Sequence, residues 1–106
     1  MVDSSGAEFL ESGGVPLGVD KDAEYEERNA KLPEGATLVL YSDGWTEAPR
    51  IGGGRVGDQD WIRRVQESAR ESDARSALNA VSRKFFPDIT MPPDDDLAGI
   101  FIRRCI

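Results

Sequence analysis

The sequence predicts a single α+β domain in which strands come first, two helices follow, and a last strand closes the order. Residues 37–41 form a short apolar, β-branched run, which is typical of a strand. Residues 58–69 and 74–85 carry apolar side chains at helical spacing. Residues 97–102 form a second apolar run. Strands and helices grouped in this way along the chain indicate an α+β fold.

Composition and charge restrict the function. The chain has 106 residues, so we expect at most one domain. Its hydrophobic content of 39% and charged content of 31% fit a globular protein better than a disordered one. The net charge of -7 argues against nucleic acid as a partner, because phosphate contacts need clustered Lys and Arg. Acidity agrees with binding of divalent cations, although most acidic side chains are simply solvated.

Missing residue types exclude further classes of protein. There is no histidine, which excludes Ser-His-Asp and Cys-His catalysis and zinc sites with imidazole ligands. The lone Cys105 cannot form an internal disulfide, as expected for a cytoplasmic protein. The sequence has no long apolar run and no basic-then-apolar leader, so we expect neither a membrane span nor secretion.

The first third of the chain predicts a hairpin, a connection and an outer strand. Residues 3–6 are a turn signal, and residues 7–10 are expected to begin a strand after it. The glycine-rich residues 13–18 lack the Lys-Ser/Thr of a phosphate-binding loop, so we interpret them as structural. Residues 25–32 alternate loosely and predict an edge or half-exposed strand. Residues 33–35 then turn the chain.

The run at residues 37–41 predicts a buried strand, and Asp43 stands where that strand ends. Gly44 follows at once and allows a sharp turn of the backbone. A carboxylate at the end of a buried strand is a common way to hold a cation or to activate water. Asp and Gly also dominate ordinary turns, so both interpretations stay open for this pair.

The middle of the chain predicts a loop and two helices. Residues 49–57 are too rich in glycine for regular structure and form either a mobile cover over Asp43 or a plain surface loop. Asp58 is expected to cap the first helix. Ser72 or Asp73 is expected to cap the second, which Pro87 ends. The apolar stripes of both helices are expected to be core.

A second acidic cluster, Asp94 to Asp96, comes just before the last apolar strand. If this strand is an antiparallel neighbour of residues 37–41, Asp43 and the cluster meet at the same edge of the sheet. Gathered carboxylates either raise a pKa or recruit a cation. Oxygen ligands without His or Cys select magnesium, manganese or calcium. An acidic turn remains the alternative, and the pattern lacks the closing glutamate of an EF-hand.

The order and spacing of several segments resemble a known family. The segments are Leu10-Glu11-Ser12-Gly13-Gly14-Val15-Pro16-Leu17-Gly18-Val19, Leu32-Pro33-Glu34-Gly35, Leu40-Tyr41-Ser42-Asp43-Gly44-Trp45-Thr46-Glu47-Ala48, and Asp95-Asp96 before a strand that ends at Arg103. They resemble the C-terminal half of the SpoIIE-like branch of the metal-dependent (protein phosphatase 2C-like) serine/threonine phosphatases. The likeness spans nearly the whole chain, and its middle segment is specific.

The resemblance implies a β-sandwich flanked by helices and hydrolysis of phosphoserine or phosphothreonine by water activated between two Mn²⁺ or Mg²⁺ ions. It implies that Asp43 and Asp95 are catalytic metal ligands. Asp96 would support them without direct coordination, and Gly44, which matches the glycine after the ligand, would contribute through its backbone. It also implies that the substrate is a phosphorylated regulatory protein of the anti-sigma-factor-antagonist type.

The sequence departs from the family pattern in three ways. Ser42 conservatively replaces a frequent threonine. Ala98 and Gly99 stand where the family usually has threonine and a larger apolar residue. The family's N-terminal half, which supplies further acidic ligands, has no counterpart here. We therefore expect residues 1–106 to be the C-terminal portion of one phosphatase domain that is inactive or weakly active alone. The alternative is a non-catalytic remnant that binds a partner or forms a homodimer through exposed sheet edges.

Overall fold

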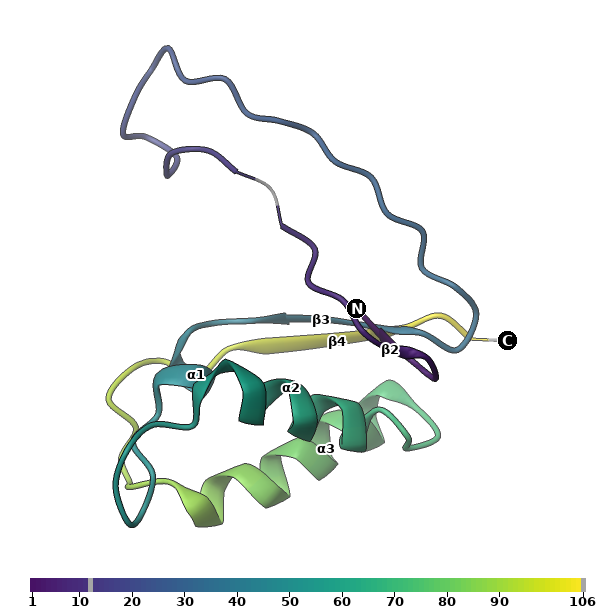
Figure 1. Ribbon diagram of the computed structural model, residues 1–106, viewed down its shortest axis with the longest axis vertical. Helices are drawn as coiled ribbons and strands as arrows, with labels where there is room; N and C mark the ends of the chain where they lie inside the picture. Colours follow the sequence, from purple (N-terminus) through teal and green to yellow (C-terminus); the bar gives the residue numbers. More distant parts are fainter. Residues whose placement is uncertain (12, 106) are drawn as a thin grey trace.

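Four short strands form one antiparallel sheet, with helices packed against one of its faces and a long arm rising from the other (Figure 1). The computed structural model describes residues 1–11 and 13–105. The elements are β1 (Val2–Asp3), β2 (Gly6–Ala7), β3 (Thr37–Tyr41), α1 (Gly44–Glu47), α2 (Gly57–Ser68), α3 (Ala74–Phe85), the 3-10 helix η1 (Phe86–Asp88) and β4 (Gly99–Arg103). No helix in the described part is long and apolar enough to cross a membrane.

The strand order is β2-β1-β3-β4, and every neighbouring pair is antiparallel. β1 and β2 form the predicted N-terminal hairpin around Ser4 and Ser5. β3 has the predicted bounds and pairs with β4 along its whole length, from Thr37 opposite Arg103 to Tyr41 opposite Gly99. The last strand therefore begins two residues later than predicted. The α+β class is confirmed, because an antiparallel sheet packs against separate helices.

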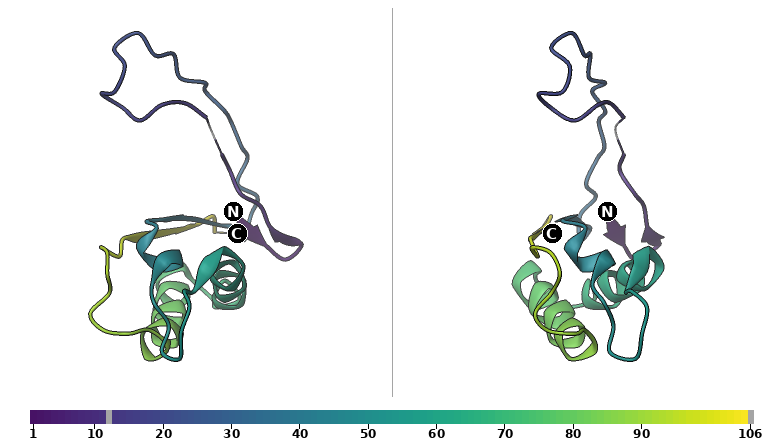
Figure 2. Two further views of the ribbon diagram at one scale, coloured as in Figure 1. Left: turned by 60° about the vertical axis from the view of Figure 1, so that its left-hand side comes forward. Right: turned by 90° about the vertical axis from the view of Figure 1, so that its left-hand side faces the viewer.

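The core lies between the sheet and the helices α2 and α3, which run side by side beneath it (Figures 1 and 2). The predicted apolar stripes provide its centre, because Trp61, Val81 and Phe85 are almost fully buried. Trp45 of α1 stacks on Trp61 with ring centroids 5.0 Å apart. From above, Val39 and Phe101 of the sheet pack against this cluster. The helical stripes are thus core, as the spacing predicts.

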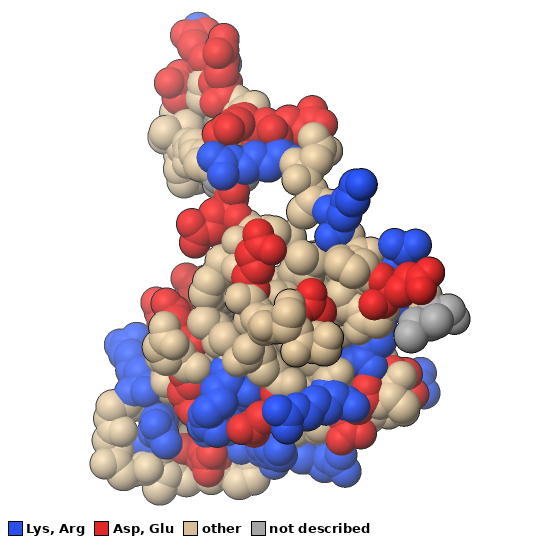
Figure 3. All heavy atoms as spheres, turned by 45° about the vertical axis from the view of Figure 1, so that its right-hand side comes forward, with Lys and Arg blue, Asp and Glu red and all other residues tan. Residues whose placement is uncertain are grey.

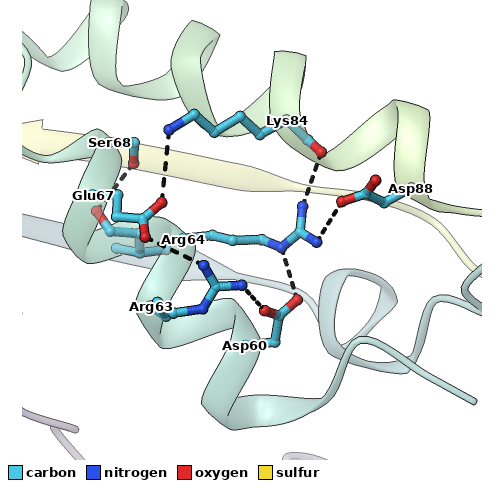
Figure 4. Close-up of polar contacts among 8 residues, drawn as sticks. Asp60, Arg63, Arg64, Glu67, Ser68, Lys84 and Asp88 are labelled. Carbon is cyan, nitrogen blue, oxygen red and sulfur yellow. Dashed lines mark hydrogen bonds and ion pairs between the residues drawn. The ribbon is translucent and has the colours of Figure 1, made fainter.

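A buried arginine joins the two helices (Figure 4). Arg64 of α2 donates from Nε to Asp60 at 2.8 Å, from Nη2 to Asp88 at 2.7 Å, and from Nη1 to the carbonyl oxygen of Lys84 at 2.9 Å. Burial opposes ionisation of Asp60, but hydrogen bonds from Arg64 and Arg63 outweigh it and lower the pKa of this carboxyl below its usual value. The network ties α2 to the end of α3.

The N-cap of α3 was predicted correctly from the sequence, and the N-cap of α2 was not. Asp73 caps α3 by accepting a hydrogen bond from the Ser76 backbone N–H at 2.7 Å, as predicted. α3 ends at Phe85, just before Pro87, as predicted. The prediction that Asp58 caps α2 is wrong, since the N-cap residue is Val56 and Asp58 lies in the first turn. A carboxylate in that first turn still favours the helix through the helix dipole.

The prediction of a strand at residues 25–32 is wrong. These residues belong to an extended arm, which we define as residues 8–11 and 13–34, and its described residues carry no strand (Figure 2). The strand expected at residues 7–10 is reduced to Gly6–Ala7. An extended segment needs a neighbouring strand to satisfy its backbone, and the arm lies away from the sheet. Residue 12, which falls within the motif described above, lies outside the described residues.

The two main strands are only half buried, although their sequences predict buried strands. Their helix-facing side chains, such as Val39 and Phe101, join the core. Their alternate residues face the other way, and Leu40, Ile100 and Ile102 are 49%, 57% and 45% exposed. Successive side chains of a strand point to opposite faces, so apolar residues at every position supply two apolar faces. The helices cover only one of these faces.

Candidate functional site

The antiparallel pairing of β3 and β4 brings the two acidic segments to the same end of the sheet, as the sequence analysis anticipated. Tyr41, the last residue of β3, lies opposite Gly99, the first residue of β4. Asp43 follows just beyond the end of β3, and Asp95 and Asp96 come just before β4. All three carboxylate residues are exposed. The pairing of β3 with β4 therefore places both acidic segments at one end of the sheet. How closely the two segments approach depends on the contacts between them.

Ser42 joins the two segments directly. Its backbone N–H donates to the carbonyl oxygen of Ala98 at 2.9 Å. Its hydroxyl donates to the carbonyl oxygen of Asp96 at 2.9 Å and accepts from the Ala98 N–H at 3.0 Å. The Ser42 hydroxyl thus acts as both donor and acceptor. It holds the backbone of Asp96 next to Ser42, which is the residue before Asp43. We call this contact set the Ser42 junction.

Gly44 lets the two segments touch. A Cβ atom on Gly44 would overlap the carbonyl oxygen of Asp96 and would lie 2.9 Å from Leu97 Cδ2 and 3.0 Å from the carbonyl carbon of Asp96. The glycine was expected to permit a sharp turn, but it begins helix α1 and its φ is not positive. Its function in the fold is instead to remove a side chain where another backbone passes. Whether its backbone contacts a metal remains a prediction.

Helix α1 is locked to the same junction by Trp45. The indole Nε1–H donates to the carbonyl oxygen of Ala98 at 2.9 Å, and the ring stacks on Trp61 beneath it. Trp45 is 5% exposed. The hydrophobic core therefore sets the position of the turn that presents Asp43. Nothing in the sequence near Trp45 indicates this link, because the hydrogen bond joins residues far apart along the chain.

A shallow pocket of about 220 Å³ lies beside this junction. It is lined by Gly44, Glu47, Ala48, Arg55, Asp94 and Asp95. Glu47 and Arg55 were not among the predicted site residues. Glu47 is the glutamate of the D-G-x-x-E segment, so its spacing from Asp43 could have drawn attention to it. Arg55 comes from the glycine-rich loop at residues 49–57, so this loop lines the pocket together with Gly44 and Asp95.

The described residues do not form a complete metal site. Residues 1–11 and 13–105 contain no group of three or more His, Cys, Asp or Glu side chains arranged to hold an ion. The residue chemistry suits a hard cation, since the donors are carboxylate oxygens, but the number of converging donors does not. The assignment of Asp43, Asp95 and Asp96 to metal binding stays a prediction.

Comparison with known proteins identifies the family. The chain matches the family described as Stage II sporulation protein E (SpoIIE) over residues 2–105. Among solved structures it is similar to the SiaA-PP2C domain of Pseudomonas aeruginosa, with a TM-score of 0.63 and 22% sequence identity. That likeness shows the fold, and it covers 78% of this chain but only 36% of the SiaA-PP2C chain. Among curated proteins, none matches. The match along nearly its whole length shows that the chain belongs to the Stage II sporulation protein E (SpoIIE) family.

Proposed function

We propose that this chain forms one wall of the active site of a metal-dependent phosphoprotein phosphatase. The substrate we propose is phosphoserine or phosphothreonine on a regulatory protein of the anti-sigma-factor-antagonist type. Family membership suggests phosphatase function. The observation that carries the proposal is the Ser42 junction, because it brings an acid at the end of one strand beside two acids before the next.

In this proposal Asp43 and Asp95 contribute two ligands of a shared cation site, and the remaining ligands come from outside this chain. Two bound Mn²⁺ or Mg²⁺ ions would activate water and neutralise phosphoryl oxygens. The chain's own task is to hold two carboxylates at a fixed separation while leaving them open to solvent. Trp45 and Ser42 stabilise this arrangement, because the buried indole and the Ser42 hydroxyl each form a hydrogen bond with the backbone of Ala98. Alone, the chain would bind a cation weakly.

Manganese titration tests whether the two acids share an ion. Paramagnetic Mn²⁺ broadens the NMR signals of nearby residues, so signals around Asp43 and Asp95 should weaken together at low Mn²⁺. Asp43→Asn and Asp95→Asn should each abolish broadening at both segments. Asp22→Asn, an acid of the arm, is the matched control and should leave it unchanged. Broadening at one segment that survives loss of the other acid would refute the shared site.

Hydrolysis of a phosphopeptide tests the activity itself. We expect little Mn²⁺-dependent turnover from the 106-residue chain, because its donor set is open. Robust turnover that Asp43→Asn removes would show that this chain suffices for catalysis. The second candidate function, a non-catalytic remnant that binds a partner, is favoured by the absence of a converging metal cluster in the described residues. It predicts no Mn²⁺-induced broadening at either acidic segment.

A further inference from the structure

The glycine-rich loop at residues 49–57, for which the sequence left open a cover or a plain surface loop, is fixed at its base. Pro49 and Arg55 form an antiparallel bridge, so the chain leaves and returns at the same place. The next residue, Val56, is 5% exposed, and its backbone N–H donates to the carbonyl oxygen of Ala48 at 3.0 Å. The hydrophobic core therefore sets the backbone position of Arg55, whose own side chain is exposed.

Backbone contacts also anchor the other side of this loop. Arg50 forms a bridge with Ile89, which is 1% exposed. The Thr90 N–H donates to the carbonyl oxygen of Pro49 at 2.9 Å. Because both sides of the loop are attached to the rest of the domain, the backbone of Arg55 is held at the edge of the pocket described above.

Arg55 shares that pocket with three acidic residues and pairs with none of them. Glu47, Asp94 and Asp95 line the pocket together with Arg55. Among the described residues, the Arg55 guanidinium has no hydrogen bond and no ion pair. It therefore does not act as an internal counter-ion for these carboxylates, and its N–H donors remain open to a ligand.

The donor and the size of the pocket indicate a phosphoryl group as that ligand. A guanidinium presents a planar fork of N–H donors, which matches two oxygens of a phosphate. The pocket volume of about 220 Å³ is below the roughly 300–1,000 Å³ of sites that enclose a whole small molecule. A compact charged group at the end of a longer side chain fits such a pocket better. Because Asp95 lines the same pocket, this group would lie beside the proposed cation site.

We propose that Arg55 is a specificity-determining residue of the phosphatase, and that its guanidinium donates hydrogen bonds to the phosphoryl oxygens of the substrate beside Asp95. This inference rests on the proposed function, since it needs a phosphorylated substrate at the two acidic segments. It adds a phosphate-binding residue that lies outside the acidic segments, on the glycine-rich loop. Arg55 transfers no proton and binds no metal, so its role is to hold the substrate.

The charge of the chain explains why a cation is needed at this place. The net charge is -7, acidic side chains crowd the arm, and both signs cover the helices (Figure 3). Such a surface repels a phosphorylated ligand, and the carboxylates of the pocket add to the repulsion. Among the described residues that line the pocket, Arg55 is the single cation. It therefore offsets part of the repulsion and favours a phosphoryl group over a neutral one.

Titration with inorganic phosphate tests the proposal on the 106-residue chain in excess Mg²⁺, which is diamagnetic and leaves the NMR signals sharp. The Nε–H signal of Arg55 should shift as phosphate binds. Arg55→Ala should weaken phosphate binding by about tenfold or more, because hydrogen bonds between charged groups are lost. Arg55→Lys keeps a point charge without the fork, so its affinity should lie between those of the wild type and Arg55→Ala.

Arg50→Ala is the matched control. Arg50 belongs to the same loop and its loss changes the net charge equally, but Arg50 does not line the pocket. This variant should bind phosphate as the wild type does. Tryptophan fluorescence shows whether each variant is folded, since Trp45 and Trp61 lie in the core. A loss of affinity in Arg50→Ala as large as in Arg55→Ala would mean that only net charge matters, and it would overturn the proposal.

Mn²⁺ broadening at Asp43 and Asp95 distinguishes failure of this inference from failure of the proposed function. Broadening should persist in Arg55→Ala, because Arg55 binds no metal. If it persists and phosphate binds this variant as tightly as the wild type, the role of Arg55 is refuted while the shared cation site stands. A wild-type chain that shows broadening but binds no phosphate has the same consequence. If the wild type shows no broadening, the proposed function fails and this inference fails with it.

Discussion

Replacing Gly44 with alanine tests whether the two acidic segments are in direct contact. Gly44 begins α1 with a backbone that any residue can adopt, so helix propensity alone would favour alanine by up to about 1 kcal/mol. The new Cβ would instead overlap the Asp96 carbonyl and lie 2.9 Å from Leu97 Cδ2. The Asp96 backbone cannot move freely, because Ser42 holds it.

Overpacking against fixed atoms costs about 1–3 kcal/mol, and contact with a backbone carbonyl belongs at the upper end of that range. We therefore expect Gly44→Ala to lower the free energy of unfolding by about 2 kcal/mol after the helix propensity is offset. Urea unfolding followed by tryptophan fluorescence measures this, since Trp45 and Trp61 both lie in the core. The midpoint should fall while the slope stays unchanged.

Two other glycines provide controls without positive φ. A Cβ at Gly99 would have its nearest neighbour at 3.6 Å, an ordinary contact, and at Gly13 it would meet no atom within 4 Å. Gly99→Ala and Gly13→Ala should change the stability by about 0.5 kcal/mol or less. If Gly44→Ala proves as stable as these two, the segments are not in contact and the reasoning behind the site fails.

Three further perturbations address the junction and the buried arginine. Ser42→Ala should cost about 0.5–1.5 kcal/mol, since it removes the hydroxyl that joins the two segments at a partly exposed position. Ser42→Thr keeps the hydroxyl and should retain most of the stability in urea unfolding. Arg64→Met should cost about 3 kcal/mol, because it removes the buried cation that joins Asp60 to Asp88 and leaves Asp60 with Arg63 alone, and thermal unfolding should show the loss. The pKa of Asp60 is lowered by folding, so its ionised form adds stability above its unfolded pKa, which is near 4. That stability should disappear as pH falls through the folded pKa of Asp60. The free energy of unfolding of Arg64→Met should therefore fall less steeply than that of the wild type over the same acid range.

Local features of the sequence predicted local structure well. Asp73 caps α3, and the apolar spacing of Trp61, Val81 and Phe85 gives the buried faces of both helices. A cap and a stripe depend on residues within one or two turns, so a short window of sequence contains the needed information. The bounds of β3 were predicted for the same reason, since its run of apolar and β-branched residues stops at a turn signal on each side.

Features that depend on distant partners were missed or misjudged. Residues 25–32 carry a strand-like pattern, yet a strand exists only where another strand pairs with it. The burial of Arg64 is not evident from the sequence, because its partners Asp88 and the carbonyl oxygen of Lys84 lie at least 20 residues away along the chain. Gly44 was taken as a turn glycine, while its actual constraint comes from Asp96, which lies far along the chain. The sequence did not predict these three features, because each of them depends on residues that are distant along the chain.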